Sequence, residues 1–146
     1  PDVRTLEFNC RMGDPETQPI MMRVKSDFSV VVEAAIQGRL DTAEIEWDRR
    51  TALGVVSAAR GYPMHPEKGA VIEKLPVNTE LTHTFHAGTK LNSDGLITVS
   101  GGRVLCTVGL GENVSTARSV AYAAMEDVIF DGKQFRTDIG YRALNR

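Results

Sequence analysis

Three polar side chains near the start of the chain have the types and spacing that chemistry on an anion requires. Glu7, Asn9 and Arg11 alternate with apolar residues over residues 6–12. Successive side chains of a strand point to opposite faces, so this alternation predicts a strand with all three on one face. Carboxylate and amide oxygens suit Mg²⁺ beside phosphates, and a guanidinium can hold a carboxylate or phosphate through two hydrogen bonds. The alternative is a half-buried edge strand whose polar face is merely solvated.

The residues that follow predict a tight turn into a helix. Gly13 permits a sharp turn or a close approach to a ligand. Asp14 is of a type that caps helix N-termini, and Pro15 suits the first helical position. Two roles for Asp14 therefore stay open, a helix cap and a contact to a substrate.

Four separated stretches, in the same order, resemble phosphoribosylamine–glycine ligases, which are ATP-grasp enzymes of purine biosynthesis also called glycinamide ribonucleotide synthetases. The first is the opening stretch, residues 6–18, and the second is residues 85–90. The third is residues 101–106, and the fourth runs from residues 130–132 on to residues 136–144. Because whole family members are several times longer, the resemblance implies the C-terminal portion of such an enzyme.

The resemblance also implies roles for the opening residues. Glu7 and Asn9 match family positions that hold Mg²⁺ or Mn²⁺ between the ATP phosphates. Arg11, Gly13 and Asp14 match positions that lie against the glycine and amine substrates. In that comparison Arg11 is the catalytic residue that holds the glycine carboxylate or the acyl phosphate.

The reaction implied by the resemblance joins glycine to 5-phosphoribosylamine with ATP hydrolysis, through a glycyl phosphate. The sequence has no glycine-rich phosphate loop with associated lysines, no evident adenine slot and no phosphoribosyl-binding N-terminal domain. We therefore expect the 146-residue chain alone to be inactive and to need the N-terminal portion of the same enzyme as its partner.

Two other interpretations remain open. One is a related ATP-grasp purine enzyme or carboxylase that shares the strand motif, against which residues 85–90 and 136–144 weigh. The other is a stand-alone binding or scaffolding module that kept the fold and lost the chemistry. The intact set of Glu7, Asn9 and Arg11 weighs against this decay.

Composition narrows the class of protein. The chain is 42% hydrophobic and 25% charged, with a net charge of −2 and a pI near 5.9. A nucleic-acid surface is normally strongly basic, and no apolar run approaches the roughly 20 residues of a membrane span. We therefore expect a cytoplasmic protein with neither a nucleic-acid nor a membrane partner. The start, without Met or a signal core, suits an internal cut.

Two groups of reactive side chains are interpreted as structural. Cys10 and Cys106 lie in apolar stretches without metal-ligand spacing, which predicts buried, reduced thiols. His65, His83 and His86 are interpreted as exposed or structural histidines because their spacing is poor for shared metal ligation.

Glycine-rich residues 101–103 predict a hairpin turn, because neither a Gly-Lys-Ser/Thr ending nor a helix follows. Arg103 at the end of this turn could still face a ligand site from the C-terminal domain.

Hydrophobic periodicity predicts helices first and strands afterwards. Helices are expected at residues 15–22 and from Ser26 or Asp27 to Gln37, with Gly38 as the stop and an apolar stripe to bury. A third helix is expected at residues 115–128. The expected strands, which form an antiparallel meander with a hairpin turn at residues 92–95, are residues 44–48, 52–59, 70–74, 81–91 with a break near 87–88, 96–99 and 103–110.

The predicted fold class is α+β. Residues 1–40 would be the C-terminal edge of an ATP-grasp domain, as the resemblance implies, and the pattern changes near Gly38. Residues 41–146 would form a small antiparallel sheet domain covered by one long helix.

Overall fold

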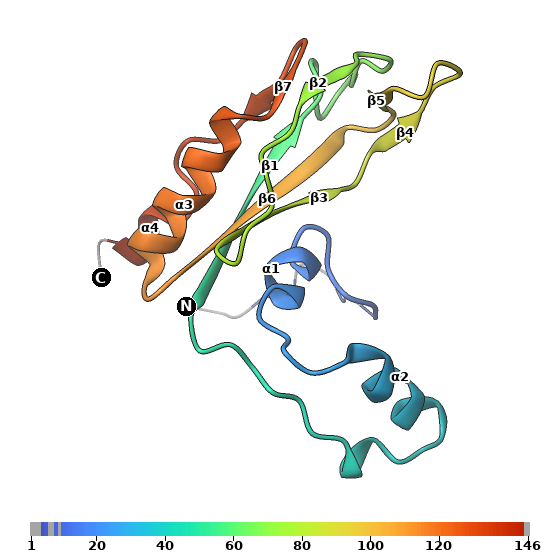
Figure 1. Ribbon diagram of the computed structural model, residues 1–146, viewed down its shortest axis with the longest axis vertical. Helices are drawn as coiled ribbons and strands as arrows, with labels where there is room; N and C mark the ends of the chain where they lie inside the picture. The colour runs from blue at the N-terminus through green and yellow to red at the C-terminus, as the bar shows by residue number, and fades with distance from the viewer. Residues whose placement is uncertain (1–3, 6–7, 9, 145–146) are drawn as a thin grey trace.

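The fold is centred on two long antiparallel strands, β1 (Thr51–Ala58) and β6 (Arg103–Gly111). The computed structural model describes residues 4–5, 8 and 10–144. The two strands pair along their length, from Thr51 opposite Gly111 to Ala58 opposite Arg103, with an irregularity after Ser57. Two shorter strands, β3 (Thr82–His86) and β8 (Gln134–Phe135), complete a four-stranded sheet in the order β3-β6-β1-β8 (Figure 1).

Helix α3 (Val114–Glu126) covers one face of this sheet and packs its buried side chains into the hydrophobic core. Asn113 caps it by accepting a hydrogen bond from the Thr116 backbone N–H at 3.0 Å. Its Ala117, Ala121 and Met125 are fully buried, as the spacing predicts. The helix can lie this close because β6 presents glycine to it: a Cβ at Gly109 would lie 2.5 Å from the Ala121 backbone nitrogen.

The short helix α1 (Thr17–Met21) packs on the opposite face of the sheet. There a Cβ at Gly54 would lie 3.1 Å from the Cys106 Sγ and 3.4 Å from the Pro19 Cγ. The middle of β6 is therefore covered on both faces, and every residue of this strand after Arg103 is buried. This double cover explains why the strand is apolar without alternation.

Two small two-stranded sheets flank the central one. In the first, β2 (Ile72–Lys74) pairs with β7 (Ile129–Phe130); in the second, β4 (Thr89–Leu91) pairs with β5 (Ile97–Val99). The predicted hairpin turn is confirmed, since the Asn92 carboxamide oxygen accepts hydrogen bonds from the backbone of Asp94 and Leu96.

The predicted continuous meander is wrong at one point. The break near residues 87–88 is present, but β6 pairs with β3 and β1 rather than with β5. The reason lies at Gly88, which donates to the Arg103 carbonyl at 2.8 Å and accepts from the Ser100 N–H at 2.7 Å. Because Gly88 bonds to both sides of the glycine-rich turn, the β4–β5 hairpin leaves the central sheet there.

Residues 23–50 form an arm beside the sheet (Figure 1). Helix α2 (Phe28–Ile36) begins after the Asp27 cap, which accepts from Ser29 N at 2.9 Å, and Gly38, with φ 68°, follows its C-cap Gln37; both signals were predicted. A short 3₁₀ helix, η1 (Leu40–Thr42), follows.

Two predictions for this arm are wrong. The apolar stripe of α2 is only partly buried: Val31 is, but Val32 and Ile36 are exposed, because within the described residues no element covers that side of the helix. Residues 44–48 form no strand, and Trp47 makes only an isolated bridge with Val24.

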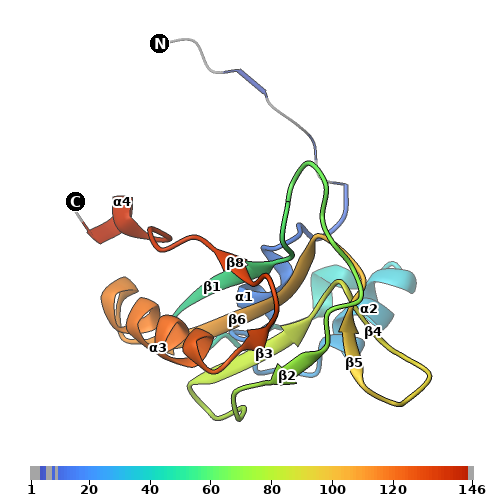
Figure 2. The ribbon, with the colours of Figure 1, turned by 90° about the horizontal axis from the view of Figure 1, so that it is seen from above.

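The C-terminal tail returns along α3 from β8 to α4 (Tyr141–Leu144), as Figure 2 shows. Arg118 and Tyr122 of α3 hold it through hydrogen bonds to its backbone. The architecture is therefore α+β, with small antiparallel sheets and covering helices, as predicted. Among the described helices, none has the length and apolarity needed to cross a membrane.

Candidate functional site

The predicted site residues fall into two groups. Glu7 and Asn9 lie outside the described residues, whereas Arg11, Gly13 and Asp14 are described. The described residues among 8–13 are not in a strand, and Cys10 is exposed. The prediction of a buried thiol is therefore wrong for Cys10, over which the described residues place no covering strand. It is confirmed for Cys106, where burial raises the thiol pKa to about 12 and the charge of Asp14 adds to the effect.

Asp14 forms an ion pair with Arg103 rather than capping a helix. The Nη2 atom of Arg103 donates to the Asp14 Oδ2 at 3.0 Å. Helix α1 begins only at Thr17, with Glu16 at the N-cap position and no side-chain cap, so neither Asp14 nor Pro15 has the helical place predicted for it. The carboxylate takes a guanidinium as its partner in place of helix N–H groups.

Gly13 and Arg11 lie just before Asp14 in the chain. The Gly13 carbonyl accepts from the backbone N–H of Thr17 at 3.0 Å and from its hydroxyl at 2.5 Å, which closes the turn before α1. A Cβ at Gly13 would meet the Glu16 side chain, with the Glu16 Cδ at 3.0 Å. Arg11 is exposed and donates to the adjacent Met12 carbonyl at 3.0 Å. Its cation faces no carboxylate among the residues described.

A cluster of glycines positions Arg103 from the other side. A Cβ at Gly88 would lie 2.6 Å from the Arg103 carbonyl oxygen and 2.7 Å from the Gly101 Cα. A Cβ at Gly102 would lie 2.6 Å from the Tyr62 ring. The two stretches around residues 88 and 101 therefore pack directly on each other. The chain bends at residues 101–102, but the predicted hairpin turn is wrong, because β5 before the bend pairs with β4 and β6 after it pairs with β3 and β1. The bend leads directly into Arg103, the first residue of β6.

Two open cavities meet at Arg103 and Tyr62, so the ion pair lies in a concave surface. One, of about 560 Å³, is lined by Asp14, Tyr62, Pro66, Ala87, Gly88, Gly102 and Arg103. The other, of about 570 Å³, runs along one face of β1, past Gly54 and Val56, to Phe135 and Arg136. Sequence reasoning missed Tyr62, which it interpreted only as part of a Gly-Tyr-Pro turn. An aromatic residue in that turn was the available signal.

No metal centre is assembled by the described part of the chain. Within it, no group of three or more His, Cys, Asp and Glu side chains could hold an ion. His83 stacks on Phe85 with ring centroids 4.4 Å apart, and His86 lies 3.0 Å from the Thr89 hydroxyl. The interpretation of both histidines as structural or exposed agrees with these contacts. A carboxylate and a carboxamide suit a hard cation, so Glu7 and Asn9 fit Mg²⁺ by donor type.

Comparison with known proteins places the chain in a family. Residues 52–142 match the family model of the phosphoribosylglycinamide synthetase C domain. The chain belongs to this family. Over 143 residues it is 60% identical to the phosphoribosylamine–glycine ligase of Ralstonia nicotianae, an alignment that covers 98% of this chain and 34% of that protein.

Other relatives and a solved structure agree. The phosphoribosylamine–glycine ligase of Escherichia coli O157:H7 is 51% identical over 144 residues, which are 98% of this chain and 34% of that protein. The crystal structure of the same ligase from Thermotoga maritima superposes with a TM-score of 0.76 at 41% identity, covering 92% of this chain and 33% of that one. The chain thus spans about a third of the length of the relatives that it matches.

Proposed function

We propose that this chain is the C-terminal part of a ligase that joins glycine to 5-phosphoribosylamine with ATP hydrolysis in purine biosynthesis. The observation that carries the proposal is the 60% identity to a phosphoribosylamine–glycine ligase over nearly the whole chain. The alignment covers 98% of the chain and so includes the opening stretch, where the candidate ligand and substrate residues lie. The working enzyme would be cytoplasmic, and its remaining two thirds would be the chain's partner.

The opening residues would supply one wall of the active site. Glu7 and Asn9 would hold Mg²⁺ or Mn²⁺, and the ion would neutralise charge on the ATP phosphates. Arg11, exposed and without a carboxylate partner among the described residues, would bind the glycine carboxylate or the acyl phosphate. It would hold the activated carbonyl in reach of the amine of 5-phosphoribosylamine.

Asp14 would act beside Arg11, in a position that its ion pair with Arg103 fixes. The ion pair fixes the Asp14 carboxylate at 3.0 Å from a guanidinium whose own strand belongs to the central sheet. The carboxylate would contact the amine substrate, and Gly13 would leave room for that approach. This assignment rests on the open cavity beside Asp14 and Arg103.

The two parts of the chain would serve different domains of the enzyme. Residues 1–40 would close the ATP-grasp domain and residues 41–146 would form the C-terminal α+β domain. The helical arm before residue 41, the strands after it and the family match that starts at residue 52 support this division. Alone, the chain would be inactive because it lacks the phosphate loop and adenine site.

The experiment joins the chain to the N-terminal two thirds of the Ralstonia ligase and measures ATP-dependent formation of glycinamide ribonucleotide. We expect activity in the joined protein and none in the 146-residue chain. Glu7→Gln and Asn9→Ala should each abolish turnover at saturating Mg²⁺ without unfolding the protein. Glu44→Gln, which removes an exposed carboxylate of the arm, is the matched control.

The outcomes separate the alternatives. No activity in a folded joined protein would favour a stand-alone binding or scaffolding module. Turnover with a different acid or amine, but not with glycine and 5-phosphoribosylamine, would favour another ATP-grasp enzyme. Near-normal turnover of Glu7→Gln or Asn9→Ala would remove the metal assignment alone.

A further inference from the structure

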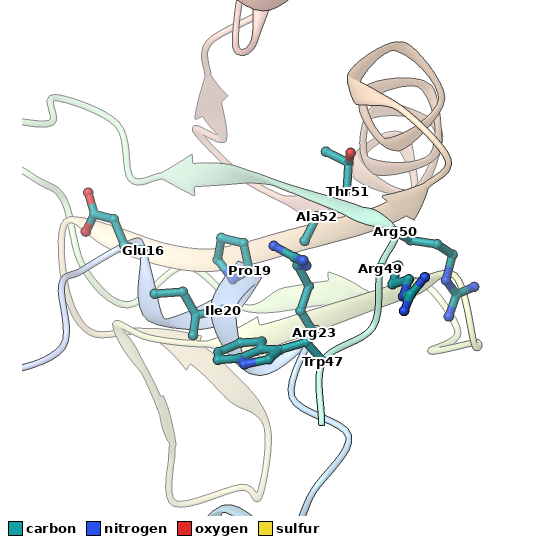
Figure 3. A pocket seen from close by; sticks show the side chains of 9 residues that line it. All are labelled: Glu16, Pro19, Ile20, Arg23, Trp47, Arg49, Arg50, Thr51 and Ala52. Carbon is teal, nitrogen blue, oxygen red and sulfur yellow. The ribbon is translucent and has the colours of Figure 1, made fainter. Parts of the chain in front are cut away.

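A second concave surface lies where α1 meets the end of the arm, and none of the predicted site residues lines it. It is an open bowl of about 790 Å³ where α1, the end of the arm and the start of β1 meet. We call it the Trp47 bowl. It is lined by Glu16, Pro19, Ile20, Arg23, Trp47, Arg49, Arg50, Thr51 and Ala52 (Figure 3).

The bowl holds three arginines and one carboxylate, that of Glu16, and among the described residues Arg50 is the only one of the three that is paired with a carboxylate. Arg50 forms a two-pronged ion pair with Asp48, with the closest contact at 2.6 Å. Arg23 donates its Nε to the Asp48 carbonyl at 3.0 Å, and its two terminal nitrogens make no hydrogen bond to the described residues. Arg49 is exposed and, within the described residues, neither it nor Arg23 lies within ion-pair distance of a carboxylate.

The base of the bowl is apolar and aromatic. Trp47 is 44% exposed and Ile20 39% exposed, although both are large hydrophobic side chains. The Arg23 guanidinium carbon lies 6.0 Å from the Trp47 ring centroid, and Figure 3 shows this guanidinium above the ring and below Ala52. Cation–π contact of this kind orients the guanidinium while its terminal N–H groups stay available.

The segment that carries these side chains is fixed by backbone bonds. Trp47 bridges to Val24, and the Asp48 N–H donates to the Arg23 carbonyl at 2.7 Å. Arg23 and Asp48 therefore bond to each other twice, once through the Asp48 N–H and once through the Asp48 carbonyl. The Arg23 guanidinium, oriented by the Asp48 carbonyl and the Trp47 ring, therefore loses little conformational entropy when an anion binds.

We propose that the Trp47 bowl binds a small phosphate monoester. Arg23 and Arg49 would hold the phosphoryl group through charge-assisted hydrogen bonds, and the organic part would pack against Trp47 and Ile20. Sugar phosphates and nucleotides share this chemistry, and both combine an anionic end with a less polar body. The proposal goes beyond the ligase function and does not depend on it, because the bowl shares none of the predicted site residues.

The test uses Trp47 as its own reporter, since it is the single tryptophan of the sequence. The 146-residue chain is titrated with AMP, ribose 5-phosphate and inorganic phosphate at constant ionic strength, and fluorescence is checked against calorimetry. We expect saturable binding of at least one ester, tighter than that of inorganic phosphate, and weakened by added salt. Preference for AMP would identify the source as a nucleotide, and preference for ribose 5-phosphate would identify a sugar phosphate.

Variants test the assigned contacts. Arg49→Gln should weaken ester binding by about tenfold or more, since a charge-assisted hydrogen bond is lost. Arg23→Gln should do the same, but it also removes the bond to the Asp48 carbonyl, so Arg49→Gln is the cleaner variant. Arg39→Gln, an equal loss of charge on an exposed arginine outside the bowl, should leave binding unchanged.

Four results would overturn the proposal. The first three are no saturable response to either ester at millimolar concentration, inorganic phosphate binding as tightly as both esters, and equal effects of Arg49→Gln and Arg39→Gln. Loss of the response in an active joined ligase would show that the remaining two thirds cover the bowl, which also overturns it. That last result would leave the ligase function intact, so the two proposals fail separately.

Discussion

Arg103 and Asp14 lie 89 positions apart in the chain, yet the Arg103 guanidinium donates to the Asp14 carboxylate at 3.0 Å. The pair joins the turn before α1 to the first residue of β6. It therefore connects the two parts of the chain that the sequence assigns to different domains. Because both residues line an open cavity, we expect the pair to act in ligand binding or catalysis as well as in packing.

This pair should matter more to catalysis than to stability. Both side chains are about half exposed, at 40% and 49%, and exposed ion pairs contribute about 0–1 kcal/mol. We expect Arg103→Ala to lower the unfolding free energy of the chain by about 1 kcal/mol or less. In the joined ligase it should reduce kcat/KM by about tenfold or more, because Asp14 loses its orientation.

Urea unfolding of the chain and steady-state kinetics of the joined ligase check this expectation. Lys74→Ala is the matched control, since Lys74 forms an equally exposed pair with Asp127 at 2.7 Å, away from the site. If Lys74→Ala and Arg103→Ala had the same small kinetic effect, the pair would be only a surface contact.

Gly109 should tolerate no side chain. A Cβ there would lie 2.5 Å from the Ala121 backbone nitrogen of α3, and helix backbone cannot give way as a flexible side chain can. We expect Gly109→Ala to lower the unfolding free energy by about 2 kcal/mol or more. Gly54→Ala is the comparison, because its Cβ would meet only side chains, the nearest being the Cys106 Sγ at 3.1 Å. A smaller loss for Gly109→Ala than for Gly54→Ala would contradict the close approach of α3.

Local signals in the sequence predicted where helices and turns lie better than they predicted which strands pair. The Asp27 cap, the Gly38 stop and the Asn92 turn depend on neighbouring residues, so the sequence alone located them correctly. The pairing of β6 with β3 depends on Gly88 meeting the 100–103 turn, and no local pattern encodes that contact.

In the candidate site, too, the sequence revealed local features but not the contacts between distant segments. The opening stretch and its resemblance identified the family, which the comparisons confirm. Of the two roles left open for Asp14, the helix cap is wrong, and its partner Arg103 could be found only from the folded chain. The Trp47 bowl was missed because its arginines come from separate segments around residues 23 and 49 and look like ordinary solvated charges.

The two cysteines should differ sharply in reactivity. Cys10 is exposed, whereas Cys106 is buried and its thiol pKa is raised to about 12, chiefly by loss of solvation. We expect one thiol to react quickly with a disulfide reagent at pH 8 and the second only after unfolding. Cys10→Ser should remove the fast phase, and Cys106→Ser should keep it. Two fast thiols in the folded wild-type chain would show that β6 is not sealed by α1.

Tyr122 should hold the C-terminal tail on α3. Its hydroxyl donates to the Arg136 carbonyl at 2.7 Å and accepts from the Ile139 N–H at 3.2 Å. Tyr122→Phe removes both bonds and should lower stability by about 1–2 kcal/mol. The Ile139 amide should exchange hydrogen faster, and trypsin should cut sooner after Arg136. Ser119→Ala on the exposed side of the same helix is the control, and equal protection of Ile139 in both variants would contradict the role of Tyr122.

The ion pair between Asp48 and Arg50 should make stability depend on acid. Hydrogen bonds from the Arg50 side chain, and then from its backbone N–H, lower the Asp48 pKa from 3.8 to about 2. The unfolded chain therefore takes up this proton more readily than the folded one. The stabilisation is complete above the unfolded pKa and is lost as the pH falls through the folded pKa.

Asp48→Asn should accordingly destabilise the chain at pH 7 and lose most of that effect at pH 2. Urea midpoints of wild type and variant at pH 7, 4 and 2 measure the difference, which cancels the titration of groups common to both proteins. Asp41→Asn, at an exposed acid of η1, gives the baseline for removing a surface carboxylate. A destabilisation by Asp48→Asn that stayed constant down to pH 2 would mean that the carboxylate is not what holds Arg50 at the rim of the Trp47 bowl.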